Sequence, residues 1–353
     1  LARQVTRKSV VLLKNEGELL PLDKKEVRKI AVIGNRAESV LKDWYGALPA
    51  YSVSALEGIK AAVEDEDVEV RFQAWDSDGK AQELAAWADV AIVCVGNHPM
   101  TSPDWKWEKI QAPWGEGTVA GDGREAVDRR SLELESEDLI KMVWKANPNT
   151  IVALISSFPY TIDWTQEHVP SILHVSQCSQ ELGNALADVI FGDYNPAGRT
   201  TQTWVKDILD LPGMLDYDIR NGRTYMYFKG EPLYPFGYGL SYTSFEYSRL
   251  KVRCQEDSVR LSFDLSNTGG RDGEEVVQLY VRFPGDDAAM RLRGFERVPV
   301  SEGETVRIDL VVPFEDLKLW DTEAGAFGLA GGRYEFLIGA SSEDIRLSDS
   351  VAL

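Results

Sequence analysis

The sequence has few of the residues that build metal sites, disulfide frameworks and membrane spans. It contains three histidines and three cysteines, Cys94, Cys178 and Cys254, and no CxxC spacing. Two of these cysteines lie in or near apolar strand patterns, so we expect buried thiols rather than metal ligands or disulfides. No apolar run approaches the roughly 20 residues that cross a bilayer. The sequence therefore predicts a globular chain without a metal, a cofactor or a membrane partner.

Positive charge is also scarce. The chain has 38 Lys and Arg against 57 Asp and Glu, which gives a net charge of -19. This balance repels nucleic-acid backbones unless basic residues cluster strongly, and no such cluster is visible in the sequence. We therefore expect no nucleic-acid partner. The chain begins abruptly, with an amphipathic helical pattern running into a strand, which suggests that another segment preceded it.

Residues 1–212 alternate between short apolar runs, several of which end at glycine, and helical patterns. This alternation predicts an α/β fold, in which a largely parallel sheet is covered by helices on both faces. The GxGxxG spacing is absent after Gly34, so no dinucleotide site is predicted. The expected strands include Lys29–Gly34, Val90–Val95, Thr150–Ser156 and Ser171–Ser176, and the expected helices include Ala81–Ala88, Ser131–Ala146 and Gln180–Phe191.

The pattern changes beyond residue 212. Residues 213–245 are rich in Pro, Gly and Tyr and are typical of a rigid linker. Residues 246–353 contain runs of alternating apolar and polar residues, separated by Gly, Asp and Pro turns, and predict an all-β sandwich. Examples of these runs are Ser258–Asn267, Glu275–Phe283, Glu304–Val312 and Arg333–Gly339. No clustered His, Cys or paired catalytic groups occur here, so we expect a structural role.

The candidate chemistry lies in the loop GDGREAVDRR, Gly121–Arg130, which follows a long insertion after the strand Val90–Val95. A loop that leaves the end of a strand lies where open α/β sheets place their ligand sites. Long loops inside compact domains are usually functional. Glu125 in this loop can act as a proton donor if its surroundings raise its pKa, or it can be an ordinary solvated charge.

Several long motifs, in order, resemble the C-terminal portion of a glycoside hydrolase family 3 enzyme, the family of β-glucosidases and β-xylosidases. The resemblance covers nearly the whole chain and implies an α/β-sandwich domain followed by a fibronectin type III-like domain. It also implies that the family's (β/α)8 barrel, which carries the nucleophilic Asp, is missing from this chain. The motifs are RKSVVLLKNEGELLPL, QELGNALADVIFGDYNPAGR, PLYPFGYGLSYTSFEY, GEEVVQLYV, LRGFERV and IGASSEDIRL.

The resemblance also implies roles for individual residues. The family's general acid/base is a Glu in a Glu-x-x-Asp-Arg context, which matches Glu125, with Asp128 and Arg129 supporting the loop. Trp44, Tyr45 and His98 are candidate substrate contacts. Asp122, Glu116 and Glu108 share the insertion and are rival acids, but each lacks the downstream Asp-Arg. Asp163, within Ile162-Asp163-Trp164, superficially resembles the nucleophile's surroundings and is interpreted as structural.

Two functions follow as expectations. The first is the acid/base-bearing portion of a retaining exo-β-glycosidase, inactive alone and completed by a barrel domain or chain, with a β-linked glycoside as substrate. The second is a non-catalytic carbohydrate-binding or assembly module. An oligomer is compatible with both. The sequence identifies neither the sugar nor the compartment, and leaves secreted, periplasmic and cytoplasmic locations open.

Overall fold

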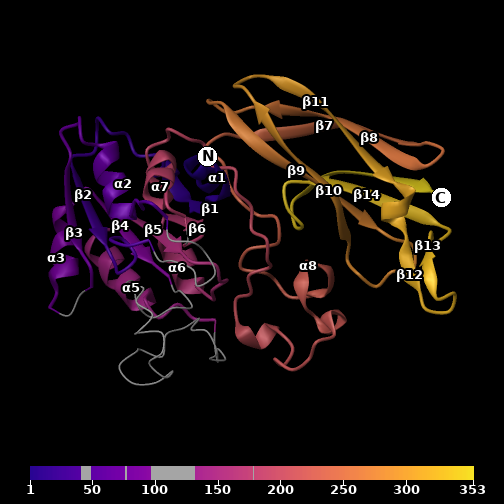
Figure 1. Cartoon of the computed structure of the whole chain (residues 1–353), viewed down its shortest axis with the longest axis horizontal. Helices are drawn as coiled ribbons and strands as arrows, with labels where there is room; N and C mark the ends of the chain where they lie inside the picture. The colour runs from indigo at the N-terminus through magenta and orange to yellow at the C-terminus, as the bar shows by residue number, and fades with distance from the viewer. Residues whose placement is uncertain (41–48, 76–77, 97–131, 178) are drawn as a thin grey trace. The chain divides into compact units, whose positions relative to one another are not determined.

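A computed structural model describes residues 1–40, 49–75, 78–96, 132–177 and 179–353. The chain divides into two compact units (Figure 1). Unit 1 comprises residues 1–198 and 205–208, and unit 2 comprises residues 199–204 and 209–353. The sequence-based boundaries at residues 212 and 246 stay a prediction. Within the described residues, no helix is long and apolar enough to span a membrane.

Unit 1 is built on a six-stranded sheet with the order β1-β6-β5-β4-β2-β3. Strands β2 to β6 pair in parallel, whereas β1 pairs antiparallel with β6 at one edge. This confirms the predicted α/β class with a largely parallel sheet. The strands are β1 (Val11–Asn15), β2 (Lys29–Ile33), β3 (Glu69–Gln73), β4 (Val90–Val95), β5 (Thr150–Ile155) and β6 (Ser171–Val175).

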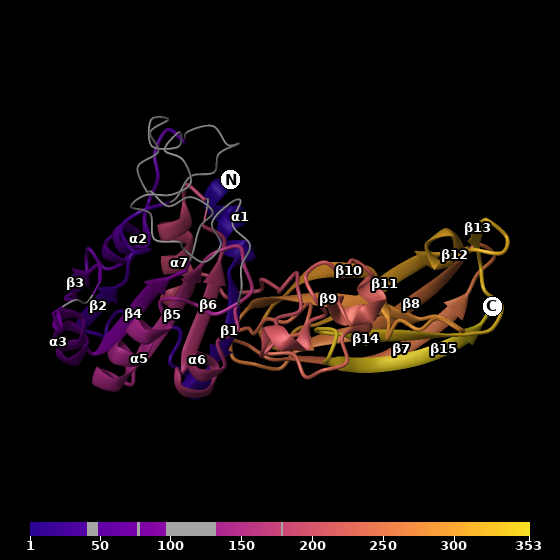
Figure 2. The same cartoon turned by 90° about the horizontal axis from the view of Figure 1, so that it is seen from below.

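Helices cover both faces of this sheet. Helices α1 and α2 both pack on α7, whereas α3 and α6 both pack on α5, and Figure 2 shows the two groups on opposite sides of the sheet. The helices are α1 (Ala2–Ser9), α2 (Ala55–Ala62), α3 (Lys80–Trp87), α5 (Glu137–Ala146), α6 (Asp163–His168) and α7 (Leu182–Ile190), with a 3-10 turn η1 (Glu16–Glu18).

Local signals explain where several helices begin. Ser54 caps α2, because its hydroxyl accepts from the Glu57 amide while the Glu57 carboxylate accepts from the Ser54 amide. Such a capping box satisfies two amides that the first turn leaves unpaired. Helix α5 begins at Glu137, so the prediction of a helix from Ser131 was wrong for residues 132–136. The apolar residues before Glu137 have helical spacing, but the backbone there is not helical.

Unit 2 is all antiparallel. Its sheets have the orders β10-β9-β14-β15 and β11-β8-β7, with a separate hairpin of β12 and β13. This confirms the predicted all-β second region. The strands are β7 (Phe245–Cys254), β8 (Ser258–Asn267), β9 (Gly273–Arg282), β10 (Arg291–Val300), β11 (Thr305–Pro313), β12 (Leu319–Asp321), β13 (Ala326–Gly328), β14 (Arg333–Gly339) and β15 (Ile345–Ala352), with η4 (Phe314–Leu317) after β11.

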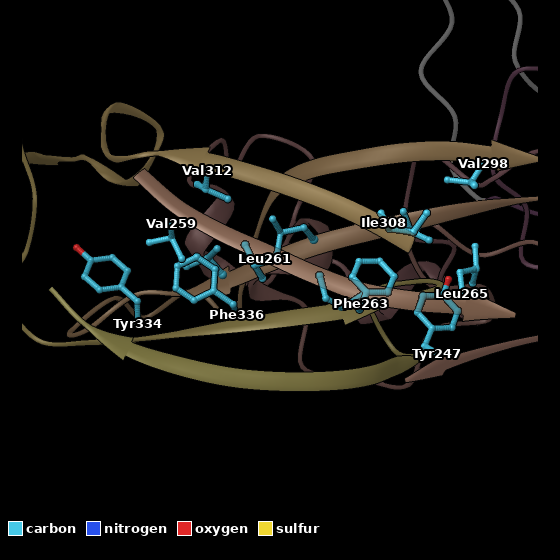
Figure 3. Packing of buried hydrophobic residues seen from close by; sticks show 14 of the residues in the cluster. Tyr247, Val259, Leu261, Phe263, Leu265, Val298, Ile308, Val312, Tyr334 and Phe336 are labelled. Atoms are coloured by element: carbon cyan, nitrogen blue, oxygen red, sulfur yellow. The ribbon is translucent and has the colours of Figure 1, made fainter. Parts of the chain in front are cut away.

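One core lies between the two larger sheets of unit 2 (Figure 3). Alternate residues of β8, including Val259, Leu261 and Phe263, are fully buried and meet Phe336 and Tyr334 of β14. The period of two places one side chain in the core and the next on the outer face. The alternation in the sequence therefore determines which face of each strand is apolar.

The Pro- and Tyr-rich segment before β7 packs against the strands of unit 2. Tyr225 stacks on Phe236 with ring centroids 4.4 Å apart, and its edge meets Tyr280 of β9. Its short helical turns are η2 (Ile208–Asp210), η3 (Ile219–Asn221) and α8 (Thr224–Tyr227). Aromatic packing therefore holds residues 224–236 against the sheet.

The expectation of buried thiols holds for Cys94 and is wrong for Cys254. Cys94 lies in the fully buried strand β4, and burial raises the pKa of its thiol to about 12. Cys254 is the last residue of β7 and is exposed. Its position at the strand end, where the chain turns away from the core, explains the difference. Cys178 lies outside the described residues.

Candidate functional site

The candidate site of unit 1 lies at the carboxyl edge of its parallel sheet. Strands β2, β4, β5 and β6 all end at this edge because they run in the same direction. Gly96 follows β4 there and is the last described residue before residues 97–131. Beyond that segment, the Leu132 carbonyl accepts from the Thr161 amide at 2.9 Å, and Thr161 lies in the connection after β5. Open α/β sheets bind ligands at such an edge.

Two glycines make the strand ends possible. Gly34, after β2, has a φ of 116°, and an added Cβ would lie 2.2 Å from the carbonyl oxygen of Cys94. Gly96 has a φ of 137°, and an added Cβ would lie 2.3 Å from the carbonyl oxygen of Ile155. Both conformations are unfavourable for residues with a side chain, and both sites exclude one sterically. The chain can therefore turn off neighbouring strands in close backbone contact.

Arg36 connects two of these strand ends. Its Nε donates to the Gly96 carbonyl at 2.9 Å, and its backbone amide donates to the Cys94 carbonyl at 3.2 Å. Burial lowers the pKa of the Arg36 guanidinium. A guanidinium has five fixed N–H donors, and Arg36 uses one of them to hold Gly96. Arg36 therefore fixes the residue from which residues 97–131 depart.

Hydroxyl groups order the connection after β5. Ser156 Oγ accepts from the buried Tyr160 hydroxyl at 2.7 Å and from the Phe158 amide at 3.1 Å. Ser157 donates to the side-chain carbonyl of Gln177, after β6, at 2.9 Å. These bonds join the carboxyl ends of adjacent strands by side chains as well as by the sheet ladder. A polar edge of this kind supplies donors and acceptors for a hydroxyl-rich ligand.

A second polar group lies where α7 begins. The Glu181 carboxylate accepts from the exposed Tyr51 hydroxyl and from the Asn184 amide at 2.8 Å. These two hydrogen bonds, Tyr51 first, lower the pKa of Glu181. Glu181 is therefore ionised at neutral pH and serves as an acceptor rather than a proton donor.

His174 lies in β6, one of the strands that end at this edge. Burial lowers the pKa of its imidazole to about 4. Part of the residue is exposed, but its Nε2 atom is buried. The ring is therefore neutral at pH 7. Within the described residues, no group of three His, Cys, Asp or Glu side chains could hold a metal ion.

The residues predicted from the sequence as site residues fall in two segments that the structure does not describe, 41–48 and 97–131. Their proximity therefore stays a prediction. By contrast, Asp163 is described, and it is an exposed residue at the start of α6. The site residues outside the described ranges are Trp44, Tyr45, His98, Glu125, Asp128 and Arg129, and the rival acids Glu108, Glu116 and Asp122 lie there too.

Sequence reasoning did not single out Arg36, Tyr51 or Glu181 as residues of this edge. A signal was available for Arg36, because it comes two residues after the glycine that ends β2. Tyr51 and Glu181 are brought together only by tertiary pairing, in which the Val53 amide donates to the Gln180 carbonyl at 2.8 Å. No pattern in the sequence spacing could have paired them.

Comparison with known proteins agrees with this architecture. Residues 10–242 match the model of the glycosyl hydrolase family 3 C-terminal domain, and residues 275–342 match that of a fibronectin type III-like domain. A β-xylosidase of Formosa agariphila is 30% identical over 97% of this chain and 48% of its own. The thermostable β-glucosidase B of Acetivibrio thermocellus is 32% identical over 99% of this chain and 48% of its own.

A solved structure shows the same fold. The β-D-glucoside glucohydrolase of Trichoderma reesei superposes with a TM-score of 0.87 at 27% identity, over 99% of this chain and 55% of that one. This chain spans about half the length of these relatives, and the family's (β/α)8 barrel is absent from it. The chain thus belongs to glycosyl hydrolase family 3, of which it comprises the C-terminal domain and the fibronectin type III-like domain.

Proposed function

We propose that this chain is the acid/base-bearing portion of a retaining exo-β-glycosidase that removes terminal non-reducing β-linked sugars. In this proposal Glu125 is the general acid/base. The nucleophilic Asp comes from a (β/α)8 barrel outside these 353 residues. The observation that carries it is the family match over residues 10–242, together with relatives named as β-xylosidase and β-glucosidase.

The described edge of unit 1 supports this role. The segment that contains Glu125 departs from Gly96, at the carboxyl end of β4, and Arg36 holds that departure point. Because Gly96 is held in place by backbone packing and by the Arg36 guanidinium, the segment that follows it should lose less conformational entropy when substrate binds. We assign Trp44, Tyr45 and His98 to substrate contacts, and Asp128 and Arg129 to the shape of the loop.

The chemistry needs two carboxyl groups roughly 5 Å apart, one attacking the anomeric carbon while the other protonates the leaving oxygen. Glu125 must be protonated for the first step, so its pKa must rise through burial or through the negative nucleophile nearby. Arg129 would lower it. In our proposal Arg129 pairs with Asp128 instead, which leaves Glu125 able to carry the proton.

The alternative is a carbohydrate-binding or assembly module without turnover. The two functions differ in whether the chain requires a barrel domain or chain. A segment that encodes a barrel directly upstream, or a barrel chain that co-purifies, supports the glycosidase, and a product of 353 residues without any barrel partner supports the module.

The deciding experiment replaces Glu125 by Ala in the protein that includes its barrel. Cleavage of substrates with poor leaving groups should fall by roughly 10² to 10⁴-fold, because the proton donor is gone. Aryl glycosides with acidic phenols should form the glycosyl-enzyme normally and then stall, because water is no longer deprotonated. Azide needs no general base, so it should restore turnover and give a glycosyl azide of retained configuration.

The matched controls are the same substitution at Asp122, Glu116 and Glu108. None of these variants should show the dependence on leaving group or the rescue by azide. Rescue of one of them, without rescue of Glu125→Ala, would transfer the acid/base role to that residue. The 353-residue chain alone should not hydrolyse aryl β-glycosides, since it lacks the nucleophile. Hydrolysis at a rate typical of the family would contradict the proposal.

A further inference from the structure

The outer face of the sheet β11-β8-β7 carries a group of basic residues that we call the cationic face: Lys251 and Arg253 of β7, Arg260 of β8 and Arg307 of β11. The inward residues of these strands belong to the core of unit 2, so the alternation along each strand places the four cations outward. Register brings them together, because Arg253 lies opposite Arg260 and Lys251 lies opposite Ser262. This corrects the expectation from the sequence that basic residues do not cluster.

The cationic face lines a hollow of about 340 Å³. Gln255 and Ser262 contribute an amide and a hydroxyl to its lining, and Asp309 contributes a single carboxylate. The four cations face the Asp309 carboxylate in this lining, and Asp264 pairs with Arg307, so positive charge remains in excess on a chain whose net charge is -19. Such a local excess attracts anions at short range, even though the molecule as a whole repels them.

Two of the four cations have no competing partner. The side chains of Lys251 and Arg253 form no ion pair or hydrogen bond with any residue in the described part of the chain. Arg260 makes one exposed pair, from its Nε to Asp309 at 3.2 Å. Arg307 is more firmly engaged, with Asp264 at 2.7 Å and the Ser262 hydroxyl at 2.5 Å. An anion can therefore bind Lys251 and Arg253 without breaking an ion pair.

The direct pairing of Arg253 with Arg260 has an energetic consequence. Like charges directly opposite each other on neighbouring strands destabilise a sheet. Both side chains are exposed, so the cost to the fold is small. A carboxylate between the two guanidinium groups would accept from both and remove the repulsion.

We propose that the cationic face binds an acidic polysaccharide through the carboxylates of its uronic acid residues. The carboxylate is argued from the charges of the face. The choice of a glycan rests on the proposed function. An enzyme that cleaves the end of a sugar chain gains effective substrate concentration when a second site binds the same chain. The site lies on unit 2 and contains none of the residues assigned to catalysis.

The composition of the hollow favours a uronate over a phosphate polymer. A polysaccharide presents hydroxyl donors as well as carboxylates, and Asp309, Gln255 and Ser262 accept or donate hydrogen bonds to hydroxyl groups. Duplex DNA carries a phosphate charge about every 1.7 Å along its axis, and its deoxyribose backbone has no hydroxyl groups that could donate to Asp309. The charge of -19 also opposes so dense a polyanion beyond the face itself.

The test measures binding of the full 353-residue chain to polygalacturonate by calorimetry, with no turnover required. The matched ligand is the same polymer after methyl esterification, which keeps the sugar chain and removes the carboxylate charge. We expect binding to polygalacturonate at low salt, loss of binding at high salt, and no binding to the ester.

The variant Lys251→Gln/Arg253→Gln should bind polygalacturonate about tenfold more weakly, because two exposed charge contacts are removed. The control is Lys25→Gln/Lys229→Gln, which removes the same charge from two exposed lysines whose ammonium groups make no ion pair or hydrogen bond within the described residues. It should bind like the original chain. Because binding does not need Glu125, a failure here leaves the proposed function intact, and a failure of the Glu125 experiment leaves this binding intact.

Each other outcome overturns the proposal. Equal binding of the methyl ester would show that carboxylates are not recognised, and equal loss in both double variants would show only an effect of net charge. Duplex DNA or anionic vesicles bound as tightly as polygalacturonate, and lost in the Lys251/Arg253 variant, would assign the face to phosphate ligands. A dimer in sedimentation that this variant dissociates would assign it to a second copy of the chain.

Discussion

The two units use their strands in opposite ways. In unit 1 every residue of β4 and β5 is buried, so packing takes both faces and the polar groups lie at the strand ends. In unit 2, strands β7 and β11 alternate between inward residues and exposed residues, and most of the exposed residues are polar. When helices cover both faces of a parallel sheet, only the strand ends are accessible to a ligand. In a β-sandwich, the outer face of each sheet is accessible as well. The effects of substitution should therefore depend on strand ends in unit 1 and on strand face in unit 2.

The largest difference is expected between the two faces of unit 2. Phe263 of β8 is fully buried and stacks on Tyr247 with ring centroids 5.9 Å apart. Phe263→Ala should lower the free energy of unfolding by about 3 to 5 kcal/mol, through lost transfer energy and the cavity left behind. Phe295→Ala, at a position of β10 that is 68% exposed, is the control and should change it by under about 0.5 kcal/mol. Urea denaturation measures both, and similar losses would contradict the division between faces.

The strand ends of unit 1 should be nearly as sensitive. Gly34→Ala places a Cβ 2.2 Å from the Cys94 carbonyl oxygen at a φ of 116°. We expect a loss of about 3 kcal/mol, from backbone strain together with displacement of β4. Gly17→Ala has a φ of 63° and no atom within 4 Å of the added Cβ, so it should cost only about 1 kcal/mol. Thermal and urea unfolding give the loss of stability in both variants. Gly17→Ala reports backbone strain alone, and Gly34→Ala reports strain together with the steric clash. Equal losses would show that the backbone near Cys94 moves aside at no cost in free energy.

Much of this contrast could be predicted from the sequence. The limits of β4 and β8 agree with the runs Val90–Val95 and Ser258–Asn267, because one is continuously apolar and the other alternates. Strands β7, β10 and β15 were not predicted. In β10, six of the ten residues are charged or are Pro or Gly, so its pattern is weak and tertiary pairing with β9 determines it.

The candidate site could be predicted only in part. The loop after β4 was placed at a strand end from the glycine that follows an apolar run, and Gly96 lies there. Tyr51 and Glu181 were missed because a long-range contact brings them together, whereas Arg36, two residues after Gly34, could have been found. The cationic face was missed for a related reason. Its charges are spread over residues 251 to 307, and only the register of three strands gathers them.

The stability of unit 1 should depend on pH through His174. The pKa of His174 is lowered to about 4 in the folded state, so between that value and its ordinary 6.5 the unfolded chain binds the proton and the folded chain does not. Stability should therefore fall as pH falls through this window, by about 1 to 2 kcal/mol between about pH 7.5 and about pH 5. In His174→Leu this part of the loss should vanish, while carboxylate contributions remain. Urea denaturation of both proteins at the two pH values gives the difference, and parallel losses would contradict a neutral His174.

The smallest effect tests whether the outer face of unit 2 is shaped by the fold or by a ligand. Arg253→Gln removes one of two guanidinium groups that face each other across β7 and β8, and Arg253 makes no ion pair with any described residue. If the like-charge pair is a cost to the fold, the variant should be more stable at low salt, by about 0.3 kcal/mol. High salt should remove the gain, because it screens exposed charges. Lys229→Gln removes the same charge from an exposed position and should show no gain. A loss of stability in Arg253→Gln would mean that this arginine supports the sheet, and would weaken the argument that its charge is kept for binding.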